Sequence, residues 1–501
     1  MERPGDLFAR HDEWNQLGEF ASSPRPGLRI AIVSGRRRQG KSYLLRRVCR
    51  RADGLYHQAA ELERPQALQR FADDVAVRLG LGRGRLQFSD WDTALRTALG
   101  LAPREGGQHA SGAAGPSRLL VLDELPYLLA HSPELPSILQ ELYDETGDRG
   151  SAPSAAVVLC GSALSIMTDL LSGTKPLRGR AQVDMTVKPF GFRESAQFWG
   201  IDDPRVAFGV NAVLGGTPGY RSLIDAAVPR TAAGIPRWLG RSVLNPAHAL
   251  FNETAYLLRE DPRIVDKALY NSILSAVAGG RHTQKEIGAL LGRDSNHLRH
   301  PMGILVSAGF LLREDDVLLQ KKPVYFIADP VIRFSEVVLD PYRSLLEERD
   351  IATTWERAAT AYSSLVLGPH FERMAVEWTA RHSGDRWGEP VGEVGPTVVN
   401  DPQGRAQHQL DVVALPRGVA RHTAGAHVVV LGEAKSSNRQ RTLADIERLE
   451  GIRSLLEARG ADTEGAQLAL FGREGFDSKL QRAAAKRSDM HLIDLNTLYM
   501  G

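Results

Sequence analysis

The chain has 501 residues, 43% hydrophobic and 24% charged, which excludes a fibrous or wholly disordered protein and suggests about three domains. With 62 Lys and Arg against 60 Asp and Glu, the net charge is +2, so any contact with nucleic acid must be local rather than driven by bulk charge. Only ten of the 62 basic residues are lysines, which leaves 52 arginines. Positions that keep a lysine are therefore informative.

The two cysteines, Cys49 and Cys160, lie far apart and have no metal-ligand spacing, which fits a reducing compartment. The start, Met1–Asp6, carries acids and no apolar run, so we expect no signal peptide. No stretch reaches the ~18 apolar residues of a membrane helix. These features predict a cytoplasmic protein without a membrane partner.

The amino-terminal part alternates short apolar strands with helical segments. We expect strands at 28–34, 118–125 and 155–161 and a helix at 42–51. Such alternation favours a parallel sheet covered by helices. The Gly-, Ala- and Ser-rich segment 104–117 is predicted to be a surface loop.

The middle of the chain reads as helical from 192 to 258, with a break at 215–219 (GGTPG). Further elements follow in an order that is typical of a winged helix-turn-helix: helices at 266–278, 283–291 and 295–308, then strands at 310–314 and 323–327.

The third of these helices is the candidate DNA-reading element. Ser295 is expected to cap it, and Asn296, His297 and Arg299 are expected to be exposed near its start. Pro301 should kink or shorten it. Residues 261–343 hold 11 basic and 10 acidic side chains, which is no basic footprint. DNA contact and a pure packing role both remain open for this domain.

The last part of the chain predicts a second α/β domain. Its expected elements are a connecting helix at 345–360, helices at 362–381, 443–459 and 477–487, and strands at 391–399, 407–414, 427–434, 467–471 and 490–495.

The segment Gly35–Ser42 fits the pattern G-x4-G-K-S/T and lies between an expected strand and an expected helix. Glycines in such a loop let backbone N–H groups surround a phosphate at a helix N-terminus. Lys41 would reach the β- and γ-phosphates, and the Ser42 hydroxyl would bind Mg²⁺. We therefore predict that Gly35, Gly40, Lys41 and Ser42 bind ATP with Mg²⁺.

The strand that ends in Asp123 and Glu124 (LLVLDE) supplies the second half of this site. Asp123 would hold Mg²⁺, directly or through water, and Glu124 would polarise the attacking water. Ser162 is a candidate sensor of the γ-phosphate. Arg180 is a candidate for stabilising the transition state, and its action on a neighbouring copy would require a homo-oligomer.

The first ~345 residues resemble the archaeal-type ATPase family, an AAA+/STAND-like branch of the P-loop ATPases. The resemblance rests on an ordered set of short segments: Leu7–Leu17, Arg37-Arg38, Cys160–Ser162, Leu177–Arg180, Gly215–Pro218 and Tyr325–Phe334. It implies an AAA+-type parallel sheet with a helical lid, Arg10 near the adenine and Pro218 in the lid.

A second group of chemistry-bearing residues lies near the carboxyl end. Asp411 stands on an apolar strand, and Glu433 and Lys435 end the next strand, where i and i+2 share a face. A helix carboxylate, Glu372 or its competitor Glu377, could join them. Such oxygen ligands bind Mg²⁺ or Mn²⁺, and a lysine can orient a metal-bound water.

The order E…D…E-x-K over residues 362–501 resembles the PD-(D/E)xK nuclease fold, a restriction-endonuclease-like α/β domain. The resemblance implies Asp411 and Glu433 as metal ligands, Lys435 as the water-positioning group, and Glu372 as outer ligand or base. An active nuclease and a degenerate fold used for assembly both remain open.

The expected domains are an ATPase core at 1–190, a lid at 191–260, a winged helix at 261–345, a linker helix at 346–361 and a nuclease-like domain at 362–501. The leading hypothesis is an ATP-driven switch with a nuclease that acts on DNA or RNA, DNA being favoured. One alternative is a regulatory ATPase whose later domains only bind partners. Another is an initiator-like ATPase that binds DNA.

Overall fold

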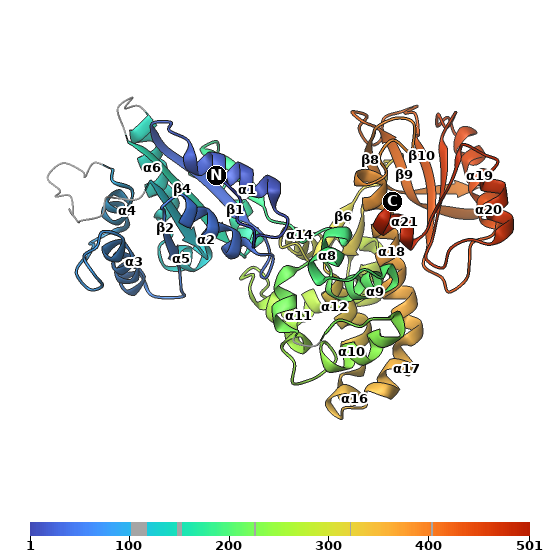
Figure 1. Ribbon diagram of the computed structural model, residues 1–501, viewed down its shortest axis with the longest axis horizontal. Helices are drawn as coiled ribbons and strands as arrows, with labels where there is room; N and C mark the ends of the chain where they lie inside the picture. The colour runs from blue at the N-terminus through green and yellow to red at the C-terminus, as the bar shows by residue number, and fades with distance from the viewer. Residues whose placement is uncertain (102–117, 148–152, 225–226, 321, 402–403) are drawn as a thin grey trace. The chain divides into compact units, whose positions relative to one another are not determined.

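The computed structural model describes residues 1–101, 118–147, 153–224, 227–320, 322–401 and 404–501 (Figure 1). The predicted surface loop at 104–117 lies outside these ranges. The chain divides into two compact units: unit 1 holds Met1–Pro189 and Leu257–Val265, and unit 2 holds Phe190–Tyr256 and Asp266–Gly501. Each is described below by itself.

Unit 1 is built on a five-stranded sheet in the order β2-β3-β4-β1-β5, with every pair parallel. Its strands are β1 (Gly27–Ser34), β2 (Leu55–Gln58), β3 (Leu119–Asp123), β4 (Ser154–Gly161) and β5 (Ala181–Thr186). The three expected strands are present as β1, β3 and β4, and their aliphatic side chains are buried on both faces, as in a helix-covered parallel sheet. The parallel sheet is thus confirmed.

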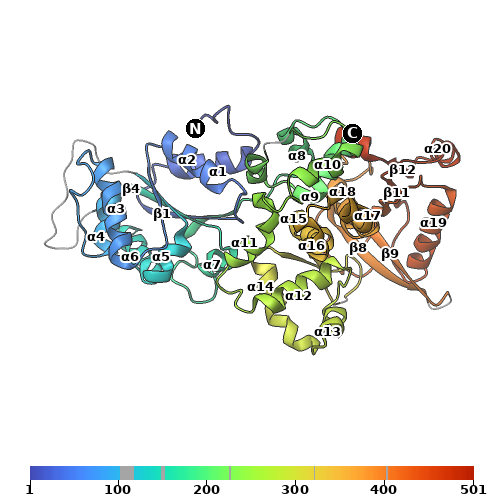
Figure 2. The same cartoon turned by 90° about the horizontal axis from the view of Figure 1, so that it is seen from below.

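Helices cover both faces of this sheet (Figure 2). They are α1 (His11–Ser22), α2 (Lys41–Arg51), α3 (Arg64–Arg78), α4 (Trp91–Leu99), α5 (Leu125–His131), α6 (Leu135–Gly147) and α7 (Leu164–Asp169). One hydrophobic core joins α1 and α2 to one face, and a second joins α3 to α6 to the other. The loop that follows β1 leads directly into α2, one of the helices that cover the sheet.

Unit 2 begins with short helices that surround the expected break at 215–219. These are α8 (Phe192–Trp199), α9 (Pro204–Leu214), the 3-10 helices η1 (Pro218–Leu223), η2 (Ala232–Gly234) and η3 (Ala249–Asn252), α10 (Ile235–Arg241) and α11 (Glu253–Arg259), whose last residues belong to unit 1.

Three helical segments and an antiparallel strand pair follow in the expected order. They are α12 (Lys267–Ala278), α13 (Gln284–Leu291), η4 (Ser295–Leu298) with α14 (Arg299–Ser307), β6 (Leu311–Glu314) and β7 (Val324–Ile327). The third helix is capped by Asp294 rather than Ser295, because the Asp294 carboxylate accepts from the Asn296 N–H. Its α-helical part begins only at Arg299, so Pro301 lies in the first turn, where a missing N–H costs nothing.

The connecting region is a chain of helices: α15 (Pro330–Phe334), the π-helix η5 (Ser335–Leu339), η6 (Asp340–Tyr342), α16 (Arg343–Glu347), α17 (Ile351–Ala361), the π-helix η7 (Tyr362–Leu367) and α18 (Gly368–Arg381). The predicted helices at 345–360 and 362–381 are thus divided differently. A break lies before Ile351, and α17 runs through η7 into α18 without interruption.

The last domain holds a mixed sheet in the order β12-β11-β10-β9-β8 (Figure 1). Its elements are β8 (Val391–Asp401), β9 (Ala406–Pro416), β10 (Val430–Lys435), α19 (Leu443–Glu457), β11 (Gln467–Gly472), α20 (Ser478–Ala484), β12 (Met490–Ile493) and α21 (Leu495–Met500). β8, β9 and β10 are antiparallel, whereas β10, β11 and β12 are parallel. Helix α18 packs on one face and α19 on the other.

Candidate functional site

The segment Gly35–Ser42 connects β1 to α2, so the motif lies in the strand–loop–helix context that a phosphate-binding loop requires. Gly40 is the N-cap of α2 and adopts φ 91°, a left-handed conformation that glycine accepts at little cost. At Gly35, a Cβ would lie 2.6 Å from the Val187 carbonyl oxygen. Both glycines are thus demanded by the local backbone.

The loop folds around its own polar side chains. Lys41 is buried, and its Nζ donates to the Arg36 carbonyl oxygen at 3.0 Å. The Gln39 side-chain oxygen accepts from the Arg36 N–H at 2.7 Å. The amine of Lys41 is therefore held inside the loop, at the start of the helix.

Asp123 ends β3 and is fully buried. The Tyr56 hydroxyl, from the neighbouring strand β2, donates to its carboxylate. Tyr56 is a site residue that sequence reasoning missed, because β2 is short and has no motif. Burial, together with the negative charge of Asp123, raises the pKa of Tyr56, so the phenol stays protonated as a donor.

Glu124 adopts φ 56°, which is uncommon for a residue with a Cβ. Its carboxylate accepts from the Ser162 hydroxyl at 3.1 Å. Ser162, expected to sense the γ-phosphate, is thus placed against the carboxylate that was expected to polarise water. The two candidates form one hydrogen-bonded pair at the carboxyl ends of β3 and β4.

Arg10 contacts the loop directly. Its guanidinium donates to the Gln39 carbonyl oxygen at 3.1 Å and to the Lys188 carbonyl oxygen at 2.6 Å. Pro218 begins η1 in unit 2.

Arg180 lies at the opposite end of the sheet from the phosphate loop. It precedes β5, where Ala181 pairs with Ile30, whereas the loop follows Ser34, which pairs with Thr186. At ~3.3 Å per residue, the two ends are about 16 Å apart. The guanidinium makes two hydrogen bonds, of 2.9 and 2.8 Å, with the Asp144 carboxylate. An action of Arg180 on the nucleotide of its own chain is therefore inconsistent with this placement.

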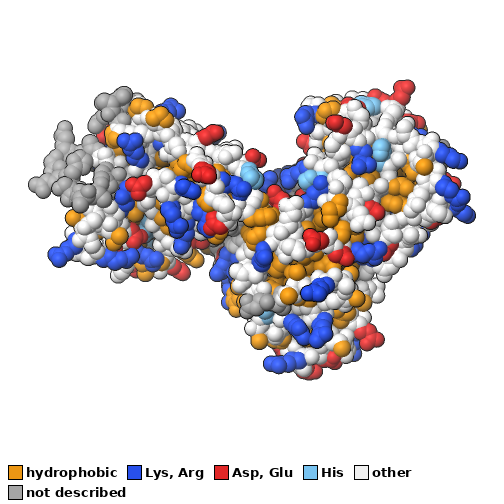
Figure 3. All heavy atoms as spheres, in the orientation of Figure 1, with side chains coloured by type: hydrophobic (Ala, Val, Ile, Leu, Met, Phe, Trp, Pro, Cys, Tyr) orange, Lys and Arg blue, Asp and Glu red, His pale blue; other side chains and the backbone are white. Residues whose placement is uncertain are grey.

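An open groove of about 790 Å³ lies beside Tyr56 in unit 1. Four arginines line it: Arg46, Arg50, Arg70 and Arg83. Its two carboxylates already have cationic or imidazole partners, Asp53 with Arg78 at 2.7 Å and Asp74 with His57 at 2.8 Å. Figure 3 shows Lys and Arg side chains on the face that carries α2 and α3. The groove is locally basic although the chain is nearly neutral.

In the last domain, neighbouring strands bring Asp411, Glu433 and Lys435 together. The Lys435 Nζ lies 3.2 Å from the Glu433 carboxylate and 3.8 Å from the Asp411 carboxylate. Asp411 also accepts from the Ala434 N–H at 2.9 Å and from the Gln409 amide at 3.3 Å. Both carboxylates are almost completely buried, whereas Lys435 is 36% exposed at its side chain.

Glu433 has one oxygen surrounded by cations and one oxygen without a partner. Its Oε1 lies 2.9 Å from Arg448, 3.2 Å from Lys435 and 3.7 Å from Arg441. Its Oε2 is buried and accepts no hydrogen bond from the described residues. An orphaned carboxylate oxygen beside a second carboxylate fits a hard divalent cation. Arg448 and Arg441 were not anticipated from the sequence.

The helix carboxylate next to this pair is Glu372 and not Glu377. Burial and the nearby Asp411 charge raise the pKa of Glu372 to about 8, against the opposing effect of Lys435. Glu377 instead lies against Gly191, whose Cβ would be 2.6 Å from its carboxylate. Within the described ranges, no three Asp, Glu, His or Cys side chains form a metal-binding group. A cation here would therefore have two protein carboxylates and water, as Mg²⁺ often does.

In the candidate DNA-reading helix, Asn296, His297 and Arg299 are all exposed. Among the helices of the described ranges, none combines the length and the apolar character of a membrane span.

No protein-family model matches the chain. It is 23% identical over 377 residues to the uncharacterized protein MJECL04 of Methanocaldococcus jannaschii, a match that covers 74% of this chain and 76% of that protein.

Three archaeal proteins are among the solved structures to which the chain is similar. The Walker-type ATPase PABY2304 of Pyrococcus abyssi has a TM-score of 0.47 at 20% identity, covering 67% of this chain and 97% of its own. The ORC2 protein of Aeropyrum pernix has a TM-score of 0.37 at 14% identity, with coverages of 70% and 96%. Cdc6p of Pyrobaculum aerophilum has a TM-score of 0.31 at 15% identity, with coverages of 69% and 96%.

Proposed function

We propose that the chain is an ATP-driven switch with an attached Mg²⁺-dependent nuclease that acts on nucleic acid, DNA being favoured. The observation that carries the nuclease assignment is the meeting of Lys435 with two buried carboxylates from neighbouring strands, one of which has an unpartnered oxygen. The phosphate loop between β1 and α2 supports the ATPase assignment.

In the proposed ATPase, the backbone of Gly35–Ser42 surrounds the phosphates and Lys41 contacts the β- and γ-phosphates. Ser42 and Asp123 hold Mg²⁺, and the Tyr56 phenol orients the Asp123 carboxylate. Glu124 polarises the attacking water, and Ser162 links that carboxylate to β4. Pro218 belongs to the proposed lid at 191–260.

In the proposed nuclease, Asp411 and Glu433 hold Mg²⁺ or Mn²⁺, which would supply positive charge and a more acidic water when bound. Lys435, whose amine lies beside both carboxylates, would hold a water next to the phosphodiester. Glu372 serves as outer ligand or base. Arg448, with a 45% exposed side chain, is available to contact a substrate phosphate.

Two surfaces support nucleic acid as the partner. The groove of four arginines offers planar forks that match phosphate oxygens. The exposed Asn296, His297 and Arg299 are side chains of the types that contact base edges in a winged helix. This second surface favours an initiator-like DNA-binding ATPase as the alternative function.

The decisive experiment measures cleavage of labelled DNA and RNA, with and without ATP, in Mg²⁺ and in Mn²⁺. Wild-type protein is compared with Lys435→Ala and with Lys41→Ala. Two exposed lysines provide matched controls, Lys479→Ala in the last domain and Lys175→Ala in unit 1. We expect Lys435→Ala to lose at least about a hundredfold in cleavage rate while it still hydrolyses ATP. We expect Lys41→Ala to lose ATP hydrolysis.

The other outcomes separate the alternatives. Cleavage that persists in Lys435→Ala would rule out this nuclease site. ATP hydrolysis without cleavage in either metal would leave a regulatory ATPase. ATP-dependent DNA binding without cleavage, lost on Arg299→Ala, would identify the initiator-like function.

A further inference from the structure

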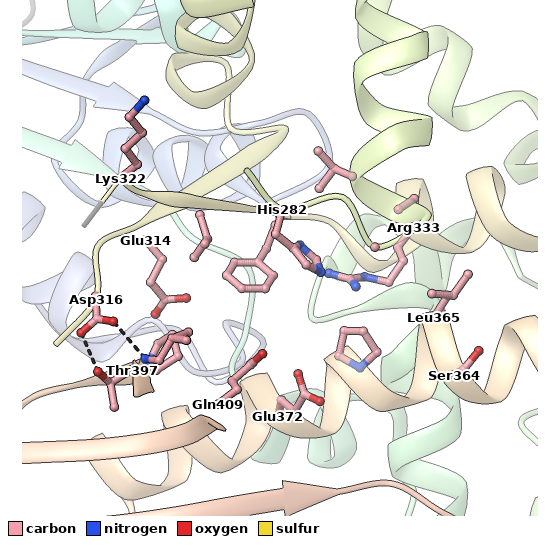
Figure 4. Close-up of a pocket in the computed structure, with 18 residues that line it drawn as sticks. His282, Glu314, Asp316, Lys322, Arg333, Ser364, Leu365, Glu372, Thr397 and Gln409 are labelled. Carbon is pink, nitrogen blue, oxygen red and sulfur yellow. Dashed lines mark hydrogen bonds between the residues drawn. The ribbon is translucent and has the colours of Figure 1, made fainter. Parts of the chain in front are cut away.

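A cavity of about 290 Å³ lies next to the proposed nuclease site, inside unit 2 (Figure 4). Residues from α12, the β6–β7 pair, α15, η7, α18, β8 and β9 line it. Two lining residues connect it to the nuclease site: Glu372, and Gln409, whose amide donates to Asp411 at 3.3 Å. A ligand in this cavity would thus adjoin the proposed scissile phosphate.

The walls of the cavity are mostly apolar and partly flat. They include Val277, Val324, Leu365 and Pro369. The rings of His282 and Phe326 lie 4.8 Å apart and tilted by 37° on one side. Its volume is close to the lower end of ligand cavities, which run from about 300 to 1,000 Å³. Such a space suits one planar ring system rather than an extended chain.

Arg333 is the buried cation of this cavity, and its hydrogen-bonding capacity is hardly used. Its side chain is 5% exposed. Among the described residues, only the Ile327 carbonyl oxygen accepts from it, at 3.3 Å, although a guanidinium has five N–H donors. Burial lowers the pKa of Arg333 to about 10, against the opposing charge of Glu372. A ligand that presents hydrogen-bond acceptors would satisfy this fork.

The other charged residues of the lining have their own partners or point elsewhere. Glu314 pairs with Arg373 at 3.0 Å. Asp316 accepts from the Thr397 hydroxyl at 2.6 Å and from the Val398 N–H at 3.0 Å. The Lys322 amine points away from the remaining labelled residues (Figure 4). Arg333, Glu372 and Gln409, together with His282 and Ser364, are therefore the polar groups of the lining that can meet a ligand.

Two π-helical segments flank the cavity. η5 begins two residues after Arg333, and η7 supplies the lining residues Ser364 and Leu365. π-helical turns are rare and frequently mark functional sites, because the wider turn moves side chains off the regular α-helical positions. One π-helix thus supplies part of the wall, and the other begins directly after the helix that carries Arg333.

We infer that this cavity binds a nucleobase of the substrate strand, with guanine preferred, next to the bond that is cut. An arginine fork matches the O6 and N7 acceptors of guanine, and a carboxyl group and an amide are suited to its other edge. Flat apolar walls are the usual surroundings of a base taken out of its stack. The inference rests on the proposed nuclease function, since that function supplies the strand.

The test uses phosphate-free probes, so that the phosphate loop does not compete, and no divalent metal. Calorimetric titration compares guanosine with adenosine, cytidine, uridine and 7-deazaguanosine, which lacks the N7 acceptor. We expect guanosine to bind about tenfold tighter than each of the others. Arg333→Met should bind guanosine about tenfold more weakly than wild type, since methionine fills the space of arginine but has no hydrogen-bond donors.

Leu365→Trp provides a second variant in case Arg333→Met does not fold, because it fills the cavity without removing a polar group. Leu290→Trp is its control, since Leu290 is 58% exposed on α13. We expect Leu365→Trp to abolish guanosine binding and Leu290→Trp to leave it unchanged, in protein shown to be folded by thermal unfolding. Guanosine binding that survives Leu365→Trp, or no binding to wild type at about 1 mM, would overturn the inference.

A second comparison tests whether the base belongs to a strand. An oligonucleotide with one guanine should bind about tenfold tighter than the same oligonucleotide with an abasic site at that position. Equal binding would overturn the assignment to the substrate strand. Neither measurement requires cleavage, so the two proposals can fail separately. A protein that binds guanosine but cuts no nucleic acid would refute the proposed nuclease and leave the base-binding cavity in place. An active nuclease that binds no nucleoside would refute the cavity and leave the nuclease in place.

Discussion

Glu336 lies at the start of the π-helix η5, where burial and the neighbouring Asp340 charge raise its pKa to about 8, against a hydrogen bond from Ser275. An unfolded glutamate loses its proton near pH 4.5. Between these two values the folded protein binds more protons than the unfolded chain, so its stability falls as the pH rises. Most of this loss should be complete above pH 8.

Glu336→Gln removes the ionisation and keeps the shape, so it should stabilise the protein above pH 8 by about 2 kcal/mol or more. At pH 4 the free energies of unfolding of Glu336→Gln and wild type should be nearly equal. Urea unfolding of both proteins from pH 4 to 9 measures the effect, with the exposed Glu347→Gln as control. Parallel stability curves for wild type and Glu336→Gln would show that Glu336 ionises as freely in the folded state as in the unfolded one.

Single residues were predictable where the chemistry restricts the choice. Lys41 and Lys435 stand out in an arginine-rich chain, and the structure places each amine among oxygen atoms: Lys41 against the Arg36 carbonyl oxygen and Lys435 beside two carboxylates. Their roles remain predictions. The choice between Glu372 and Glu377 was not predictable, since five residues on a helix turn the side chain by about 140° and either face could be inward. Tyr56 and Arg448 have no motif, and Arg333 belongs to the segment Tyr325–Phe334 without a site being expected for it, so only the folded arrangement brings these residues to their sites.

At the scale of elements, the turn Gly215-Gly216 is held against another segment of unit 2. The Phe190 N–H donates to the Gly216 carbonyl oxygen at 2.8 Å, and a Cβ on Gly216 would lie 1.8 Å from the Phe190 carbonyl oxygen. Any side chain at position 216 would therefore require the backbone of Phe190 or of the turn to move. Gly216→Ala should therefore destabilise the protein by about 3 kcal/mol or more, which thermal unfolding measures.

Gly303→Ala is the matched control. Gly303 is exposed on α14, and nothing lies within 4 Å of its Cβ position, so alanine should be neutral or stabilise by up to about 1 kcal/mol. Equal unfolding temperatures for Gly216→Ala and wild type would mean that the turn does not pack on Phe190 in solution.

The elements that the sequence predicted are those with long, uniform patterns. β1, β3 and β4 are aliphatic runs buried on both faces, which only a covered strand explains. β2 has four residues, and β5 lies at the sheet edge with Met185 as its one buried residue, so neither gives a distinct signal. The helix α21 was not predicted, and the last strand was expected to run to Leu495, whereas β12 ends at Ile493 and Asp494 caps a new helix. No sequence pattern indicates the π-helices.

For the whole molecule, the near-zero net charge is compatible with nucleic-acid binding only if positive charge is concentrated. The arginine groove beside Tyr56 provides such a concentration in unit 1. Its position also gives it a route to the phosphate site, since Arg46 lies 5.0 Å above the Tyr56 ring and Tyr56 donates to Asp123. Two contacts thus connect the groove to Asp123, the proposed magnesium ligand.

The placement of Arg180 bears on assembly. It lies at the amino end of β5, about 16 Å along the sheet from the loop that holds Lys41, so it cannot reach the nucleotide of its own chain. If it stabilises the transition state, it does so in a neighbouring copy, after its hydrogen bonds to Asp144 open. Arg180→Ala should then lower the rate of ATP hydrolysis about a thousandfold.

A mixing experiment checks the shared site. Lys41→Ala lacks a working nucleotide site but keeps Arg180, whereas Arg180→Ala has the opposite defect. Mixed in equal amounts, the two inactive proteins should regain hydrolysis well above the sum of their separate rates, because some interfaces then join an intact loop to an intact arginine. Arg178→Ala serves as the control and should remain active, because Arg178 is exposed and its guanidinium donates to the Gly173 carbonyl oxygen. A mixture no faster than its two components would place the stabilising charge elsewhere and leave Arg180 as a structural partner of Asp144.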